Sequence, residues 1–389
     1  MNGNYVPLES LMVRRGGSID PSKFKDEEFD LYSIPAFDRG GSDLVFGRDI
    51  GSSKQVLETG DVLLSKIVPH IRRAWVVGAP RQRRIIGSGE WIVFRGAKSA
   101  NPRYLSHVLV GDPFHSQFMQ TVSGVGGSLL RARPAQLAKI EIPLPPLAEQ
   151  KRIAAILDAA DALRAKRREA LAQLDALLQS TFLTLFGDPV ENPMGWPVVT
   201  IGDLLSSTAY GTSTKAHEEK RGFPCLRMNN ITYAGGWDFR SLKYVDLKPK
   251  EVSKNTVHRG QILFNRTNSK ELVGKTAVYR RDEPMAFAGY LVRGITNAEA
   301  DAEYISAFLN LPQGKAILQG MCKSIVGMAN INAQEFKSIS LPKPPIALQQ
   351  RFAAVVKSVE HQKAAQRGHL TELDALFAAL QHRAFRGEL

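Results

Sequence analysis

The chain has few cysteines, no long apolar run and no N-terminal stretch in which basic residues precede apolar ones. Each absence argues against a class of protein. Its 389 residues include 2 cysteines, Cys225 and Cys322, too few for a disulfide framework or a zinc cage. We interpret both as ordinary buried thiols and expect a reducing, cytoplasmic setting. No run approaches the roughly 20 apolar residues that cross a bilayer, and MNGNYVPLES lacks the layout of a signal peptide, so no membrane partner is expected.

Acidic residues are also in deficit. There are 51 Lys and Arg against 38 Asp and Glu, which gives a net charge of +13. A basic balance of this size favours a polyanionic partner. The excess is uneven: the net charge is +6 over residues 1–140 and +5 over 190–340, but −1 over 141–189 and +3 over 341–389. Two long segments therefore carry most of the positive charge.

Motifs of catalysis are missing as well. GKT at 274–276 resembles the end of a phosphate-binding loop, but Ser269 stands where that loop needs its first glycine. The double prolines are followed by Leu147 and Ile346, not by the aromatic residue of an adenine methyltransferase motif. Eight scattered histidines show no metal-ligand spacing. We therefore expect a non-catalytic chain without a metal site.

What the chain does contain is a repeat. PLPPLAEQKRIAA at 143–155 recurs as PKPPIALQQRFAA at 342–354, an offset of 199 residues. The register continues without a gap for more than 40 residues: LDAL at 174–177 matches LDAL at 373–376, and Phe186 matches Phe385. A gapless match of this length indicates an internal duplication.

Each copy predicts one long helix. The prolines impose an extended entry, and good helix formers follow them. The first helix is expected to end near Phe186, because Gly187 and Pro189 come next. A helix of about 38 residues, at ~1.5 Å per residue, is a rod of roughly 57 Å.

A stripe of positions spaced by four and three residues predicts a coiled-coil seam, through which two antiparallel rods would pair. In the first copy it comprises Ile156, Ala160, Leu163, Arg167, Ala170, Leu174, Leu177 and Thr181. In the second copy it comprises Val355, Val359, Gln362, Gln366, His369, Leu373, Leu376 and Leu380.

The long basic segments resemble each other too. GDVLLSKI begins at Gly60 and GQILFNRT at Gly260, an offset of 200 residues. Short β-branched runs broken by glycine, asparagine and aspartate fill both segments, which predicts compact, mostly β modules with some helix. The predicted fold is of the α/β (α+β) class, with two modules, two rods and pseudo-two-fold symmetry. Its expected parts are 1–141, 142–188, 189–340 and 341–389.

Two basic modules on a stiff spacer would contact a DNA duplex at two places. The proline entry with AEQKRIAAILD, the duplicated helices and the variable modules resemble the specificity subunit of type I restriction-modification systems. YSIPAFD at 32–38, SSK at 52–54, GDVLLSKIVPHIRRAW at 60–75 and GSGEWIVFR at 87–95 resemble one kind of target-recognition domain of that family. FPCLRMNNI at 223–231 and LFNRTNSKELVGKTAVY at 263–279 resemble another. The resemblance covers essentially the whole chain.

The resemblance implies that each module binds one half of a split site in double-stranded DNA. It also implies that the rods set the spacing and dock two methyltransferase subunits, through which the restriction and translocase subunits join. S-adenosylmethionine, ATP and Mg are then expected on the partner subunits, with no cofactor on this chain. The alternative is a structural coiled-coil adaptor whose basic modules bind protein or RNA, which predicts no sequence preference on duplex DNA. A self-contained modifying enzyme would have to bind S-adenosylmethionine alone.

Candidate DNA contacts lie in or after the segments that begin at Gly60 and Gly260 and in the motifs of the family resemblance. Arginine and asparagine among them can form two hydrogen bonds with guanine and adenine. They are Lys54, Ser65, Lys66, Arg72, Arg73, Arg227, Asn229, Asn265, Arg266, Asn268, Lys270 and Lys275. Candidate positions for partner docking and the helical spacer are Pro145, Pro146, Gln150, Arg152, Leu174, Leu177, Pro344, Pro345, Gln349, Arg351, Leu373 and Leu376.

Overall fold

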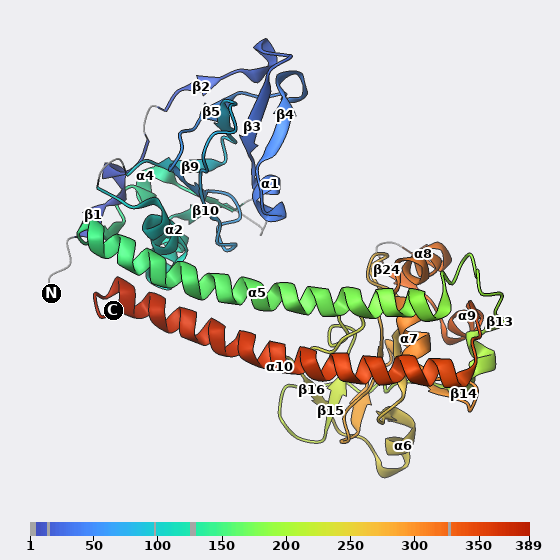
Figure 1. Cartoon of the computed structure of the whole chain (residues 1–389). Coiled ribbons are helices and arrows are strands. Elements are labelled where there is room, and N and C mark those ends of the chain that lie inside the picture. The colour runs from blue at the N-terminus through green and yellow to red at the C-terminus, as the bar shows by residue number, and fades with distance from the viewer. Residues whose placement is uncertain (1–4, 14–15, 97–98, 125–129, 326–327) are drawn as a thin grey trace. The chain divides into compact units, whose positions relative to one another are not determined.

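The computed structural model describes residues 5–13, 16–96, 99–124, 130–325 and 328–389. It is a mixed fold of helices and sheets (Figure 1), as the sequence predicts. The chain divides into two compact units, of which unit 1 comprises residues 1–168 and 368–389 and unit 2 comprises 169–367. Each unit therefore joins one globular segment to portions of both long helices. Of the two thiols, Cys225 is buried as expected, whereas Cys322 is only partly buried.

Unit 1 contains two main sheets. One has the strand order β2-β5-β8-β3-β4 and the other the order β7-β6-β9. The strands are β1 (Tyr5–Pro7), β2 (Ser18–Ile19), β3 (Glu28–Tyr32), β4 (Asp43–Phe46), β5 (Lys54–Val56), β6 (Val62–Ser65), β7 (Ala74–Val76), β8 (Ile85–Gly87), β9 (Trp91–Phe94), β10 (Val122–Ser123), β11 (Arg131–Ala132) and β12 (Glu141–Pro143). The short helices are α1 (Ile34–Arg39), α2 (Pro102–Val110), α3 (Asp112–Gln120) and α4 (Pro134–Leu137).

Unit 2 has a corresponding pair of sheets, in the orders β16-β15-β21-β17 and β14-β22-β18-β20. Its strands are β13 (Val198–Thr200), β14 (Leu205–Tyr210), β15 (Phe223–Leu226), β16 (Lys243–Val245), β17 (Thr256–Val257), β18 (Ile262–Asn265), β19 (Thr267–Asn268), β20 (Thr276–Val278), β21 (Met285–Phe287), β22 (Leu291–Thr296), β23 (Lys323–Ile325), β24 (Met328–Asn330) and β25 (Ser340–Pro342). Its short helices are α6 (Val252–Asn255), α7 (Ala302–Asn310), α8 (Pro312–Met321) and α9 (Ala333–Lys337).

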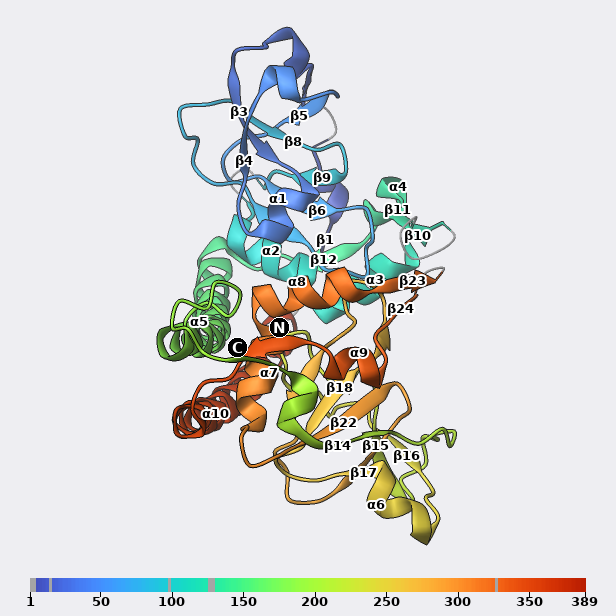
Figure 2. The ribbon, with the colours of Figure 1, turned by 90° about the vertical axis from the view of Figure 1, so that its right-hand side faces the viewer.

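The segments GDVLLSKI, from Gly60, and GQILFNRT, from Gly260, occupy equivalent places in unit 1 and unit 2. β6 lies between β7 and β9 in unit 1, and β18 lies between β20 and β22 in unit 2. Figure 2 labels β6 with β9 and β18 with β22. Both strands are buried along their whole length, which explains their unbroken apolar runs. A glycine in the left-handed region begins each turn, with φ of 86° at Gly60 and 84° at Gly260. The register also repeats, since Val62 pairs with Phe94 and Ile262 with Gly294.

The long helices are α5 (Leu147–Phe186) and α10 (Ile346–Phe385), each of 40 residues (Figure 1). Both begin directly after the double prolines, and α5 ends at the predicted residue. Gly187 follows with φ of 78°, a conformation that ends helices. The two predicted helices, their starts after the prolines and the predicted end of the first near Phe186 are therefore confirmed.

Within each unit, the portions of α5 and α10 pack side by side and run antiparallel. In unit 1, Arg152 donates to the carbonyl of Leu389 (2.7 Å), and Arg164 pairs with Asp374 (2.6 Å). In unit 2, Lys363 pairs with Asp175 (2.7 Å), and Phe352 packs edge-on against Phe182 and Phe186. In both units, residues further along α5 contact residues earlier in α10, which is the pattern of antiparallel helices.

The predicted seam is wrong at several positions. Leu163, Leu177 and Leu376 are 50%, 47% and 49% exposed. Two predicted positions, Ala160 and Val359, are buried. At four other places the residue after the predicted position is the buried one: Leu157, Phe182, Val356 and Lys363. The reason is that each helix also packs on its globular segment, so its buried face is set by two neighbours. A leucine stripe alone does not show which face turns inward.

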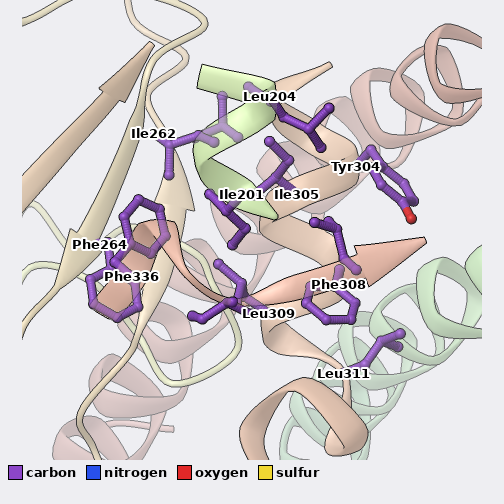
Figure 3. Close-up of a cluster of buried hydrophobic side chains, with 14 of the residues drawn as sticks. Ile201, Leu204, Ile262, Phe264, Tyr304, Ile305, Phe308, Leu309, Leu311 and Phe336 are labelled. Atoms are coloured by element: carbon purple, nitrogen blue, oxygen red, sulfur yellow. The ribbon is translucent and has the colours of Figure 1, made fainter. Parts of the chain in front are cut away.

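Each unit has its own hydrophobic core. In unit 1, Leu105, Leu109 and Phe118 of α2 and α3 join Leu157 of α5. In unit 2, helix α7 contributes Tyr304, Ile305, Phe308 and Leu309 to the cluster shown in Figure 3. Phe264 stacks on Phe336 with ring centroids 4.4 Å apart. Phe182 of α5 stacks on Tyr304 of α7 with centroids 5.5 Å apart. Truncating such a buried ring to alanine costs about 3–5 kcal/mol, so these contacts fix each globular segment on its helices.

Candidate nucleic-acid interface

A basic hollow of about 540 Å³ opens on unit 2. Four cationic side chains line it, and among the described residues that line it none is acidic; the cations are Lys215, Arg227, Lys243 and Arg266. The rest of its lining consists of the loop 212–216, Cys225, Thr267 and residues 288–290. A concave surface with charge of one sign attracts phosphates and the acceptor edges of bases. We therefore take this hollow as the candidate DNA contact of unit 2.

Arg266 of the hollow is held by two contacts within unit 2. Its guanidinium carbon lies 5.0 Å from the centre of the Tyr210 ring. The Tyr210 hydroxyl is itself fixed, because it accepts a hydrogen bond from the backbone N–H of Ala333 (3.0 Å). The Nη2 atom of Arg266 makes only a long bond to Asn330 Oδ1 (3.4 Å), and its buried Nε has no hydrogen-bond partner among the described residues. The contact with the ring restrains the guanidinium while leaving it short of hydrogen-bond acceptors.

Lys66 occupies the corresponding place in unit 1. Its Nζ donates to the carbonyl of Gly89 (2.5 Å) and lies 3.9 Å from the carboxylate of Glu90. Arg131 pairs with the same carboxylate at 3.2 Å. One acid between two cations thus replaces the tyrosines and asparagine that surround Arg266.

Several predicted contacts already have internal partners. Ser65 and Asn265 end the buried strands β6 and β18 and are 1% and 0% exposed. The Ser65 hydroxyl donates to the carbonyl of Ile67 (2.9 Å). Arg73 makes a two-pronged pair with Asp38 (2.7 and 2.9 Å). These bonds hold Ser65 and Arg73 within unit 1. Asn265 Oδ1 accepts from the N–H of Thr267 (3.3 Å), whereas its buried Nδ2 has no hydrogen-bond partner among the described residues.

Lys275 is also withdrawn from the surface. It is 7% exposed, and its Nζ donates to the carbonyl of Met228 (2.5 Å). Burial lowers its pKa. Lys315 of α8 is as buried, and burial together with the charge of Lys275 lowers its pKa to about 8. The ammonium groups of Lys275 and Lys315 therefore lie in the same poorly solvated part of unit 2.

The remaining predicted contacts lie nearer the surface. Arg72 pairs with Asp112 (2.6 Å) and donates to the carbonyl of Val110 (3.0 Å). Lys54 donates to Ser52, and its pKa is lowered by burial. Arg227 donates to the carbonyl of Ser241 (3.1 Å) and lines the hollow with Arg266. Asn229 and Lys270 are exposed, while Asn268 is half-buried. Unit 2 thus brings Arg227 and Arg266 together in one surface.

The predicted docking positions divide into two groups. Gln150 and Gln349 are 1% and 0% exposed and bond internally. Gln150 Oε1 accepts from the N–H of Asn101 (2.7 Å), and its Nε2 donates to the carbonyls of Ser99 and Pro145. Gln349 repeats this with Asp301 (2.9 Å), Glu299 and Pro344. Each glutamine ties the start of a long helix to its globular segment.

The other group is more accessible. Pro146, Arg152, Leu177, Pro345, Arg351 and Leu376 are exposed, Pro145, Leu174 and Leu373 are half-buried, and Pro344 is buried. Arg152 pairs with Glu149 at 2.7 Å. Leu177 and Leu376 present apolar area to the surroundings from equivalent places of the repeat. A docked partner subunit would cover such area.

Charged triads recur between the helices. In unit 1, Arg164 pairs with Asp161 on its own helix and with Asp374 across. In unit 2, Lys363 pairs with Glu360 and, across, with Asp175. The members are related by the 199-residue offset of the repeat. These contacts explain the polar positions in the middle of the helices.

Sequence reasoning missed Glu90, Arg131, Tyr290 and Asn330. A usable signal existed for two of them, because GEWIVF and GYLVRG are related by the 200-residue offset and place Glu90 and Tyr290 at one position. Among the described residues there is no cluster of three metal-ligating side chains and no helix with the length and apolarity to cross a membrane.

Comparisons with known proteins agree with this geometry. The family model described as the type I restriction modification DNA specificity domain matches residues 54–173 and 193–375, which together make up most of the chain. This family favours DNA recognition over the adaptor alternative.

Two relatives and one solved structure illustrate the similarity. The chain is 26% identical over 286 residues to the type I restriction enzyme EcoKI specificity subunit of Escherichia coli (strain K12), covering 68% of this chain and 61% of that protein, less than two thirds of its length. It is 24% identical to the StySPI specificity subunit of Salmonella potsdam, covering 99% and 84%. The type I restriction-modification S subunit from M. genitalium shares its fold, with a TM-score of 0.56 at 13% identity over 99% of this chain and 96% of that one. The chain belongs to the family of the type I restriction-modification DNA specificity domain.

Proposed function

We propose that this chain is the specificity subunit of a type I restriction-modification complex and that it binds a split site in double-stranded DNA. The observation that carries the proposal is that one arrangement of contacts occurs twice. The hydroxyl of Tyr104 donates to the carbonyl of Pro143 (2.9 Å), and that of Tyr304 to Pro342 (2.6 Å). These two bonds, the matching hydrogen bonds of Gln150 and Gln349 and the matching strand registers support an internal duplication. Two similar DNA-binding modules suit a site read in two parts.

The proposal includes a division of labour along the chain. Residues 1–141 and 189–340 are the two target-recognition domains, and 142–188 and 341–389 are spacers that pair as an antiparallel coiled coil. The ion pairs Arg164–Asp374 and Lys363–Asp175 support that pairing. The spacers would set the distance between the half-sites.

The chain is proposed to be non-catalytic and to act through partners. Two methyltransferase subunits would dock on the exposed positions of the spacers, and the restriction and translocase subunits would join through them. S-adenosylmethionine, ATP and Mg would be bound by those subunits. Because its substrate is chromosomal and invading DNA, the complex would act in the cytoplasm.

Affinity purification of the tagged chain from its host tests the proposal. Recovery of a methyltransferase at two copies per chain is expected, and sequencing of methylated bases in host DNA should give a motif of two short blocks with an unread gap. Recovery of no methyltransferase, together with no DNA motif that depends on this gene, would refute it.

A further inference from the structure

Equivalent positions in the two units carry different side chains on one backbone framework. We propose that three of these positions form the base-reading set of each unit: Lys66, Glu90 and Arg131 in unit 1, and Arg266, Tyr290 and Asn330 in unit 2. This inference rests on the proposed function and adds the residues and the bases they would recognise.

The framework is fixed by hydrogen bonds that repeat closely. In unit 1 the N–H of Lys66 donates to the carbonyl of Glu90 (3.1 Å), and the carbonyl of Lys66 accepts from Ala132 (2.8 Å). In unit 2 the N–H of Arg266 donates to Tyr290 (3.0 Å), and its carbonyl accepts from Ile331 (2.8 Å). The backbone therefore presents the three side chains in the same way in both units. Two different half-sites require this combination of constant position and variable chemistry.

In unit 2 the set is suited to guanine. Arg266 is stacked on Tyr210, bonded only weakly to Asn330, and lines a hollow with no acidic lining residue among those described. A guanidinium that is restrained by a ring and short of acceptors matches the paired O6 and N7 acceptors of guanine. Tyr290, 53% exposed, borders the same hollow. The half-site of unit 2 therefore includes a guanine contacted by Arg266.

In unit 1 the set is suited to a guanine–cytosine pair. The Glu90 carboxylate can accept a hydrogen bond from the cytosine amino group, and the fork of Arg131 can donate to guanine. The side chain of Arg131 is 60% exposed and paired with Glu90 at 3.2 Å, so the two polar groups are presented together. Because a carboxylate repels phosphates, a role in reading bases is more fitting for Glu90 than one in binding the DNA backbone.

The test is a selection from random duplex DNA by the complex purified from its host, comparing the unaltered chain with Arg266→Lys, Arg266→Gln and Glu90→Gln. Arg266→Lys keeps the charge but loses the fork, so it separates base reading from phosphate binding. Arg240→Gln is the matched control, because Arg240 is 90% exposed and pairs with Asp238 on the surface of the same unit. Thermal melting of each variant shows whether it is folded.

Both changes at Arg266 should lower the preference for one guanine roughly 10- to 100-fold and leave the other half-site unchanged. Glu90→Gln should alter only the other half-site, and the control should alter neither. A preference retained by Arg266→Lys, or an equal weakening at every position, would overturn the inference. If the unaltered complex selects no split site, the proposed function itself fails, and this inference with it.

Discussion

The buried glutamines Gln150 and Gln349 offer the sharpest test of how the long helices are attached. Each side-chain amide makes three hydrogen bonds to backbone groups of its unit, and neither is solvated. Leucine has a similar volume but can make none of these bonds. The substitutions Gln150→Leu and Gln349→Leu therefore leave one buried N–H and two carbonyls without partners.

The magnitude follows from those three bonds. A net loss of about 1 kcal/mol for each of the three bonds gives roughly 3 kcal/mol per variant. Each unit contains close to 200 residues. For that size a loss of ~1 kcal/mol lowers the melting temperature by about 2–4 °C, so a fall of roughly 6–12 °C is expected.

Differential scanning calorimetry and amide hydrogen exchange measure the effect. Gln350→Leu is the control, since Gln350 is the exposed neighbour of Gln349 and undergoes the same substitution. Exchange at the amide of Asp301 should accelerate in Gln349→Leu, and at Asn101 in Gln150→Leu. Melting of Gln349→Leu within 1 °C of the control, with an unchanged Asp301 amide, would refute the clamp.

Three further predictions concern charge and the helix surface. Lys315→Met should stabilise the chain at pH 7. The pKa of Lys315 is about 8 in the folded chain and 10.5 ordinarily, so the buried charge lowers the stability of the fold by its full amount below pH 8. This loss of stability is relieved as the pH rises from 8 toward 10.5. The gain, ~2 kcal/mol after the lost bond to Asn310, should shrink by pH 9.5 in paired melting curves, and an equal gain at both pH values would contradict it. Lys363→Met should cost about 1–3 kcal/mol, because it leaves Asp175 and Glu360 facing each other, whereas Arg168→Met, at a 3.5 Å exposed pair, should cost less than about 0.5 kcal/mol; equal losses in thermal melts would argue against the triad. Leu177→Lys and Leu376→Lys should leave the melting temperature nearly unchanged while each reduces the methyltransferase recovered with the chain, and full recovery with the double variant would show that docking occurs elsewhere.

Local sequence rules were sufficient for the long helices and for the repeat. Helix α5 is preceded by prolines, is rich in helix-forming residues and is followed by glycine. Each of these signals acts on neighbouring residues, so the limits of α5 at Leu147 and Phe186 could be read from the sequence. The offset of 200 residues between GDVLLSKI and GQILFNRT likewise placed β6 and β18 at equivalent positions.

The buried face of each helix could not be read in this way. Leu163 and Leu157 lie on the same helix and both suit an apolar face, yet one is 50% exposed and the other fully buried. Only packing against the globular segment decides between them. Polar residues at strand ends misled for a similar reason: Ser65 and Asn265 are typical of exposed loops, but they end central strands and are covered.

The candidate site depended on contacts between distant parts of the chain. Arg266 was predicted from its position after a strand, but Tyr210 and Asn330, which hold it, are more than fifty residues away on either side. No local pattern links these three residues. The same holds for Lys66, whose neighbours Glu90 and Arg131 come from a turn and a separate strand.

The central claim is that the two units read two separate parts of one DNA site. The most direct measurement is a selection from a random duplex library by the purified complex, followed by sequencing of the bound DNA. We expect two short blocks of defined sequence separated by a gap of fixed length and no preference. A single continuous block, or bound DNA without any sequence in common, would contradict the claim.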